Sequence, residues 1–259
     1  MTVHIERRDS IAIVTLDRPE ALNAVNGALA LALGEALETA ETDDNVQVIV
    51  LTGRGRTFCA GADLKAIAAG EGLDPPGHPD WGFAGITRHR LRKPTIAAVN
   101  GAALGGGTEI VLACDLAVMS ETAHLGLPEV RWGLFPAGGG TIRLPREMPP
   151  KIALEHLLSG APITAVDAAR WGLVNRVVPP DLVMPTALEL AASVAANGPI
   201  AVRAAKRLAN AATGAGSDRD AEMWAANADA IAEVFTSQDA AEGMAAFVER
   251  RTPGPWLGR

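Results

Sequence analysis

The chain has 259 residues, of which 48% are hydrophobic and 20% are charged. This length allows one or two domains with a core that needs neither disulfide bonds nor a structural metal. The net charge of −7 and the aromatic content of 4% argue against a nucleic-acid-binding protein, because such surfaces need cations and stacking rings.

The cysteine content and the N-terminus favour a cytoplasmic protein. Cys59 and Cys114 are too few for a secreted disulfide framework. Residues 1–9 mix charged and apolar side chains and lack the apolar segment of a signal peptide. The apolar stretch at residues 95–114 contains a glutamate and several glycines, so it reads as a buried strand and helix, not as a membrane span. We therefore expect no association with membranes.

Strands alternate with helices in the first part of the chain. The β-branched runs at residues 11–16 and 46–52 predict strands. Between them, leucines recur at every fourth position behind Asn26, a favoured N-cap residue, which predicts a helix. Further strands are predicted at residues 95–99, 116–119 and 174–178. Strands separated by helices indicate parallel sheets.

The middle and the end of the chain have a different character. Residues 71–80 (EGLDPPGHPD) predict a loop or a mobile lid. After residue 180 only helices are predicted, at 181–197, 199–212, 219–235 and 237–251. We therefore divide the chain into an α/β body, residues 1–198, and a helical region, residues 199–259. The helical region is short for a domain, so we expect it to pack on the body or on a neighbouring subunit.

Several chemistries lack their sequence motifs. The chain contains no P-loop, no GxGxxG after a strand and no GxSxG elbow. The histidines show no metal-ligand spacing, and neither cysteine lies in a CxxC motif. We expect neither a metal nor a redox cofactor. The basic run at residues 88–93 (RHRLRK) predicts a solvated helix face, with contact to a phosphate as the alternative.

Two glycine-rich passages follow predicted strands and precede helices. Residues 58–65 (FCAGADLK) contain Asp63 as a potential helix cap, and residues 100–109 (NGAALGGGTE) contain three consecutive glycines. One backbone N–H from each passage, aided by the dipole of the second helix, would stabilise a developing oxyanion. The alternative is that these glycines serve tight turns and close helix–sheet packing.

Two glutamates lie in apolar surroundings. Glu109 enters an apolar helix, and Glu129 lies within residues 125–130 (LGLPEV). Burial would raise both pKa values, and mutual proximity would raise one of them further. Two such carboxyl groups can act as base and acid on one substrate. For either glutamate, a surface or helix-capping charge is the alternative.

Together these motifs resemble the crotonase (enoyl-CoA hydratase/isomerase) superfamily along nearly the whole chain. The resemblance is carried by residues 13–24 (IVTLDRPEALNA), 58–65, 97–109 (AAVNGAALGGGTE), 128–129 (PE), 138–144 (GGGTIRL), 168–177 (AARWGLVNRV) and 242–247 (EGMAAF). This combination is highly specific for the family and much less specific for the reaction.

The resemblance implies an α/β fold with the crotonase-type ββα spiral core and a C-terminal helical region used for trimerisation. It implies homotrimers or hexamers built as dimers of trimers. The substrate would be a coenzyme A thioester, with no further cofactor. The N–H groups of Ala62 and Gly106 would bind the thioester carbonyl and stabilise an enolate. The implied acyl-CoA-binding residues are Ala60, Ala62, Asp63, Leu64, Lys65 and Gly106.

The reaction depends on the two carboxylates, because both positions that carry Glu in hydratases carry Glu here. By resemblance, Glu109 would deprotonate a water that attacks C3, and Glu129 would protonate C2. Isomerases of the superfamily often keep only the second carboxylate. The prediction is an enoyl-CoA hydratase, a lyase that forms 3-hydroxyacyl-CoA. The alternatives are a Δ3/Δ2-enoyl-CoA isomerase, a dehydratase of the carnitinyl-CoA type, or a non-catalytic acyl-CoA binder.

One position departs from the hydratase pattern. Ala137 stands where hydratases usually have glycine, at a backbone N–H that helps to hold the catalytic water in those enzymes. Alanine keeps the N–H but adds a methyl group and restricts φ. Two interpretations follow: the alanine leaves the water in place, or its methyl group reshapes the pocket for another acyl group.

Overall fold

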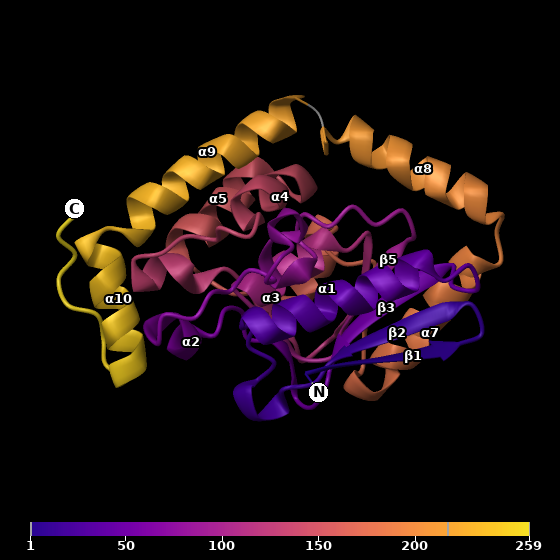
Figure 1. The fold of residues 1–259 in the computed structure, drawn as a ribbon, viewed down its shortest axis with the longest axis horizontal. Helices are drawn as coiled ribbons and strands as arrows, with labels where there is room; N and C mark the ends of the chain where they lie inside the picture. Colours follow the sequence, from indigo (N-terminus) through magenta and orange to yellow (C-terminus); the bar gives the residue numbers. More distant parts are fainter. Residues whose placement is uncertain (1, 217, 259) are drawn as a thin grey trace.

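The computed structural model describes residues 2–216 and 218–258. Its main sheet has six strands in the order β1-β2-β3-β5-β7-β10, and Figure 1 shows it with helices packed around it. The strands of this sheet are β1 (Val3–Arg8), β2 (Ile11–Leu16), β3 (Val48–Gly53), β5 (Thr95–Val99), β7 (Leu116–Ser120) and β10 (Arg176–Val178). Apart from the antiparallel β1–β2 hairpin, all neighbouring strands are parallel, as predicted.

A second, smaller sheet lies beside the first. Its four strands, in the order β4-β6-β8-β9, are β4 (Thr57–Cys59), β6 (Ala102–Leu104), β8 (His124–Gly126) and β9 (Ile163–Thr164). Neither this sheet nor β1 was predicted from the sequence. The strands of the small sheet are only two or three residues long, and β1 is an edge strand with mainly exposed, charged side chains. Such segments carry no periodic hydrophobic signal.

Apart from the basic run at residues 88–93, the predicted helices are present. The helices are α1 (Gly27–Thr42), α2 (Leu64–Ala68), α3 (Gly106–Ala113), α4 (Gly140–Glu147), α5 (Pro150–Ser159), α6 (Ala165–Trp171), α7 (Val183–Ala195), α8 (Pro199–Ala212), α9 (Asp218–Phe235) and α10 (Gln238–Glu249). Of these, α4, α5 and α6 were not predicted. Short 3₁₀ turns are η1 (Pro19–Ala21), η2 (Pro79–Trp81), η3 (Phe83–Gly85), η4 (Pro128–Trp132) and η5 (Pro180–Leu182). Asn26 caps α1 as predicted, because its side chain accepts from the Leu29 N–H at 3.0 Å. Residues 71–78 form an irregular loop, also as predicted.

The inner strands of the main sheet are buried on both faces. Along β3, Val48 and Val50 face a core that includes Ala187 and Ala191 of α7. The alternate residues of β3 face the larger core, which contains the buried leucines of α1. A strand covered on both sides needs a continuous apolar run, which is why β2, β3 and β5 were recognisable in the sequence.

The helical region extends along one side of the body. Figure 1 shows α8 and α9 forming an arc, with α10 at its far end beside α2. Helix α8 has no buried residue, whereas α10 approaches η4 so closely that a Cβ on Gly243 would lie 1.8 Å from the Trp132 carbonyl oxygen. The division at residue 198 stays a prediction.

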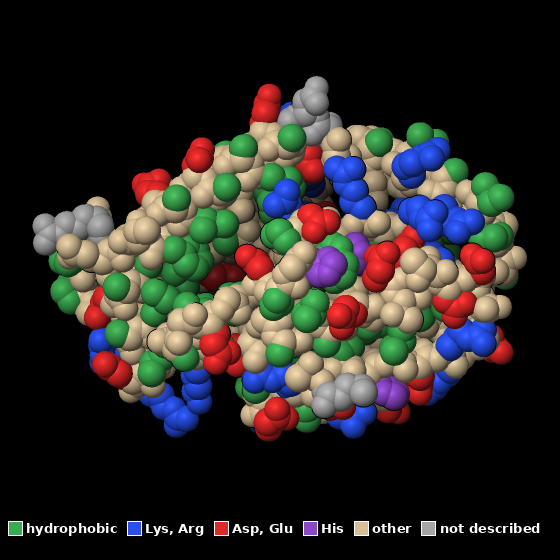
Figure 2. Space-filling view, viewed as in Figure 1, with side chains coloured by type: hydrophobic (Ala, Val, Ile, Leu, Met, Phe, Trp, Pro, Cys, Tyr) green, Lys and Arg blue, Asp and Glu red, His purple; other side chains and the backbone are tan. Residues whose placement is uncertain are grey.

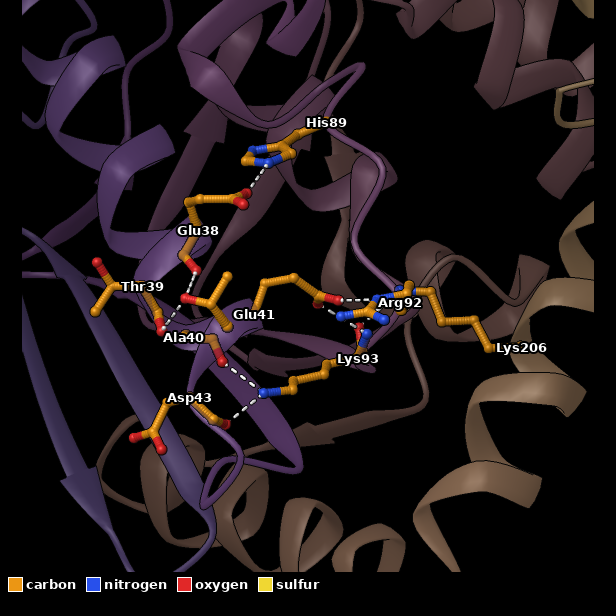
Figure 3. A network of polar contacts seen from close by, with 10 residues as sticks. Glu38, Thr39, Ala40, Glu41, Asp43, His89, Arg92, Lys93 and Lys206 are labelled. Atoms are coloured by element: carbon orange, nitrogen blue, oxygen red, sulfur yellow. Dashed lines mark hydrogen bonds and ion pairs between the residues drawn. The ribbon is translucent and has the colours of Figure 1, made fainter.

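The basic run at residues 88–93 is not a helix, which corrects the interpretation from the sequence. The segment is irregular, and Lys93 is only 3% exposed. Its Nζ donates to the carbonyl oxygens of Ala40 and Asp43, at 2.8 and 2.6 Å (Figure 3). These carbonyls lie at the C-terminal end of α1, where a helix leaves acceptors unsatisfied and favours a cation. Burial lowers the pKa of Lys93.

The same cluster contains a buried carboxylate. Glu41 accepts from the Lys93 backbone N–H at 3.1 Å and from Arg92 Nε at 2.7 Å (Figure 3). The Arg92 side chain is 70% exposed, whereas Glu41 is buried. The buried lysine, not the exposed arginine, therefore ties the segment before β5 to α1.

Replacing Lys93 by Met should lower the free energy of unfolding by about 2–4 kcal/mol, because it leaves buried carbonyls without a donor. Arg92→Gln is the matched control and should cost less, about 1 kcal/mol, since the arginine is largely solvated and the buried Glu41 keeps its bond from the Lys93 N–H. Urea denaturation followed by circular dichroism measures both. Equal losses for the two variants would contradict the assignment of the tie to Lys93.

Candidate active site

The two glycine-rich passages meet because β4 and β6 pair in parallel. A Cβ on Gly61, whose φ is +90°, would lie 2.6 Å from the Leu104 carbonyl oxygen and 3.1 Å from the Gly106 nitrogen. A Cβ on Gly107 would lie 2.1 Å from the Cys59 carbonyl oxygen. Glycines at 61 and 107 therefore permit close packing, which was the alternative interpretation of these passages. The same contact brings the ends of the two passages side by side.

Close packing leaves two backbone donors free. Val25 bonds to the residues on either side of Ala62, through Gly61 O and Asp63 N, both at 2.8 Å. Gly106 is the first residue of α3, where an N–H has no partner within the helix. Among the hydrogen bonds of the described residues, none uses the N–H of Ala62 or of Gly106. Two adjacent donors are thus available to a ligand.

Asp63 has the capping role predicted for it. Its side chain accepts from the Ala66 N–H at 3.3 Å at the start of α2. It also forms an ion pair with Arg18 at 3.3 Å, which joins the first glycine-rich passage to the N-terminal motif.

The two glutamates flank the N-terminal end of α3. Glu109 lies in the first turn of this helix and is 3% exposed. Its Oε1 accepts from the Gly140 N–H at 2.8 Å, and a Cβ on Gly138 would lie 2.5 Å from its Oε2. Glu129 lies in η4 with its Oε1 3.0 Å from where a Cβ on Gly105 would be. Glu109 is therefore not a surface charge, and Glu129 is half-buried with its Oε2 atom buried. The helix-capping alternative holds in part, because Glu109 accepts from the first N–H of α4.

The environment makes both carboxyl groups harder to ionise. Burial raises the pKa of Glu109, while the Gly140 N–H, the Arg143 cation and the Gly138 N–H, in decreasing order, lower it. Burial also raises the pKa of Glu129, and the charge of Glu109 raises it further. Within the described part of the chain, the buried Oε2 of Glu129 has no hydrogen-bond partner. The arrangement thus favours an ionised Glu109 beside a protonated Glu129.

Reasoning from the sequence missed three side chains that surround this pair. The Arg143 guanidinium donates to the carbonyl oxygens of Thr87 and Gly138 and lies 5.4 Å from the Trp224 ring centroid. The Phe83 ring covers α3, because a Cβ on Gly106 would lie 2.3 Å from it. The third is Asn227, which is only 8% exposed on α9. Arg143 lies inside the GGGTIRL motif, but no sequence signal pointed to Phe83 or Asn227.

An entry groove of about 1460 Å³ leads to the first glycine-rich passage. Its walls include five of the predicted binding residues, namely Ala60, Ala62, Asp63, Leu64 and Lys65, but not Gly106, Glu109 or Glu129. The groove carries five Lys and Arg against three Asp and Glu, so it is locally basic in an acidic chain. Two of the cations, Arg250 and Arg251, follow α10.

Figure 2 shows a hollow beneath α9 that is lined by hydrophobic side chains and has an acidic side chain at its depth. Within residues 2–216 and 218–258, His, Cys, Asp and Glu side chains nowhere gather in threes or more as a metal ion would need. In the same part of the chain, no helix combines the length and the apolarity needed to cross a bilayer.

Comparison with known proteins agrees with this geometry. The family described as "Enoyl-CoA hydratase/isomerase" matches residues 6–258. The chain belongs to this family. The resemblance predicted from the motifs, the α/β fold class and the expectation of an enzyme of this family are thereby confirmed.

The relatives of this chain include proteins named carnitinyl-CoA dehydratase or hydratase and proteins named enoyl-CoA hydratase. The carnitinyl-CoA dehydratase of Proteus mirabilis (strain HI4320) is 40% identical, over 100% of this chain and 99% of its own. A solved structure of carnitinyl-CoA hydratase from Mycobacterium avium is 49% identical with a TM-score of 0.95, covering 100% of this chain and 99% of that one. An enoyl-CoA hydratase from Mycobacterium tuberculosis H37Rv is 43% identical with a TM-score of 0.79, at the same coverage.

The raised pKa of Glu109 predicts a pH-dependent stability difference. A carboxyl group whose pKa is raised in the folded protein contributes stability while it is protonated, and this contribution is lost as pH rises from 4.5 through the raised pKa. The Glu109→Gln variant has no carboxyl group to ionise here, so it does not lose this stability as pH rises. Relative to the wild type, the variant should therefore gain free energy of unfolding between pH 5 and pH 8, on the order of 2 kcal/mol.

Urea titrations at a series of pH values measure this difference. Glu35→Gln, at an exposed position of α1, is the control and should show none. A constant difference between Glu109→Gln and the wild type from pH 5 to pH 8 would refute the electrostatic description of the site.

Proposed function

We propose that this protein is an enoyl-CoA hydratase, a hydro-lyase that adds water reversibly to a 2-enoyl-CoA thioester. One observation carries the proposal: the buried Glu109 and the half-buried Glu129, both with raised pKa values, flank the helix end where the Gly106 N–H is free. The free N–H of Ala62 lies in the passage that packs against this end. Family membership makes a CoA thioester the expected substrate.

The first step is polarisation of the thioester. Its carbonyl oxygen would accept from the N–H groups of Ala62 and Gly106, and the N-terminal end of α3 adds the positive end of its dipole. Both donors gain strength as negative charge develops on the oxygen. Losing one such donor typically raises the barrier by about 2.7–4 kcal/mol. The CoA part would lie in the entry groove, along Ala60 and residues 63–65.

The second step is addition across the double bond. Glu109 takes a proton from water as the water oxygen bonds to C3, and the electron pair of the double bond moves into an enolate. Glu129 then gives its proton to C2, so that the elements of water are added and 3-hydroxyacyl-CoA forms. The electrostatics support these roles, because the charge of Glu109 raises the pKa of Glu129 and so favours its protonated form. Dehydration is the same sequence reversed.

A second candidate is a dehydratase of the carnitinyl-CoA type. It is supported by the 40–41% identity to proteins with that name and the 49% identity to the Mycobacterium avium structure. It uses the same residues on a different acyl group. A Δ3/Δ2-enoyl-CoA isomerase and a non-catalytic acyl-CoA binder are less favoured, because both glutamates are present at the site and both have raised pKa values.

The proposal includes a homotrimer or hexamer acting in the cytoplasm, with an acyl-CoA as its only small-molecule partner. Support for assembly comes from α8, where Ile200 and Leu208 expose apolar side chains to solvent in the isolated chain.

Purified protein should consume crotonyl-CoA, seen as loss of the conjugated-enoyl absorbance, with 3-hydroxyacyl-CoA identified by mass spectrometry. Glu109→Gln and Glu129→Gln should each lower kcat at least about 100-fold, because each removes a proton-transfer group. Glu35→Gln should leave turnover unchanged. Near-normal turnover in both active-site variants would overturn the assigned chemistry.

Two further substrates separate the candidates. Carnitinyl-CoA dehydrated faster than crotonyl-CoA is hydrated would establish the second candidate. Conversion of a 3-enoyl-CoA to the 2-enoyl isomer faster than hydration would establish the isomerase. Tight binding of every acyl-CoA without conversion would establish the binder.

A further inference from the structure

Asn227 has an unusual position on α9. This helix lies on the outside of the molecule, and the residues at 225, 226, 228 and 229 are all exposed. Asn227 is buried, with 8% of its surface exposed. Burying an amide costs free energy unless its hydrogen bonds are made, so its contacts need a reason beyond apolar packing.

Its contact is with the backbone that supports Glu109. Asn227 Nδ2 donates to the Ala137 carbonyl oxygen at 2.9 Å. This carbonyl belongs to the same peptide unit as the Gly138 N–H. Gly138 lies against the Glu109 carboxylate, since a Cβ on it would be 2.5 Å from Oε2, and its N–H lowers the pKa of Glu109. The C=O and N–H of a trans peptide lie in one plane and point in opposite directions. A donor on the carbonyl therefore orients and polarises the N–H on the other side.

We propose that Asn227 is a positioning residue for Glu109, acting through the peptide between Ala137 and Gly138. It fixes this peptide from the side away from the carboxylate, so that the N–H stays directed at Glu109. The proposal rests on the proposed role of Glu109 as the base. It gives the helical region, residues 199–259, a part in the chemistry in addition to any part in assembly.

A neighbouring peptide is held in a similar way. Arg143 Nη1 donates to the Gly138 carbonyl oxygen at 3.5 Å, so consecutive carbonyls are held by α9 and by α4. Gly138 permits the approach, because a Cβ there would lie 2.5 Å from Glu109 Oε2. Helix α9 is itself held over this segment by Trp224. The centroid of its ring lies 5.2 Å from the guanidinium carbon of Arg88 and 5.4 Å from that of Arg143.

The charged groups around Glu109 are distinct from Asn227. Arg143 acts on Glu109 from α4, and Glu129 faces it from η4. Arg143 in turn faces Glu147, Asp220 and Arg146. Asn227 does not titrate, so its replacement changes the pKa of Glu109 without adding or removing a charge. Replacement by leucine keeps the size and removes the donor.

The test measures Glu109 directly, by the carboxyl signal of ¹³C-labelled glutamate during a pH titration. The Glu129→Gln background leaves one of the two site carboxyls to titrate, and Glu109→Gln assigns its signal. Asn227→Leu should move the titration midpoint upward by about half a pH unit to one pH unit, because the anion loses part of its hydrogen bonding. In the otherwise wild-type protein, kcat for crotonyl-CoA should fall about threefold to tenfold with KM nearly unchanged.

Asn210→Leu, at an exposed position of α8, is the control and should change neither quantity. If Asn227→Leu does not fold, Asn227→Ser is used, whose hydroxyl is too short to replace the bond. An unchanged Glu109 midpoint in the folded variant overturns the proposal, whatever happens to its thermal stability. A shifted midpoint in the Glu129→Gln background, together with a wild-type protein that turns over no enoyl-CoA, supports the positioning role and rejects the proposed function.

Discussion

The two free N–H groups of the site depend on one constraint, the close approach of two backbone passages after the short parallel strands β4 and β6. Their contact tolerates no side chain at Gly61 or Gly107, where a Cβ would lie 2.6 and 2.1 Å from a carbonyl oxygen of the other passage. Because the passages touch, the N–H groups of Ala62 and Gly106 lie near each other with no partner among the described residues. The glycines thus serve packing and donor placement together, and the two interpretations of the passages are not exclusive.

The acid–base pair depends on a second arrangement, built around the start of α3. Glu109 stays buried because the loop that begins α4 supplies N–H groups and Arg143 supplies a nearby cation. Glu129 has only its own backbone N–H to favour its anion, and the charge of Glu109 raises its pKa further. Two chemically identical groups thereby differ in how easily they ionise, and Glu129 is the harder of the two to ionise. Asn227 of α9 donates to a carbonyl oxygen of the same loop, the contact on which its proposed positioning role rests.

Much of the fold was predictable because the inner strands of its main sheet are covered on both sides. Strands β2 and β5 were predicted with the correct bounds, since continuous apolar runs are needed there. Glu109 and Glu129 were predicted from charge in apolar sequence. Contacts across the chain carried no such signal: Asn227 meets Ala137 from 90 residues away. The burial of Lys93 was missed for the same reason, because the carbonyls it binds lie at the end of a distant helix.

The most direct test of the account is a crystal structure with a non-reactive 3-ketoacyl-CoA bound. The account predicts that the thioester oxygen lies within hydrogen-bond distance of both the Ala62 and the Gly106 N–H. It also predicts that C2 and C3 of the acyl group lie between the carboxyl groups of Glu129 and Glu109. A thioester bound elsewhere in the groove, with these two N–H groups still unoccupied, would contradict it.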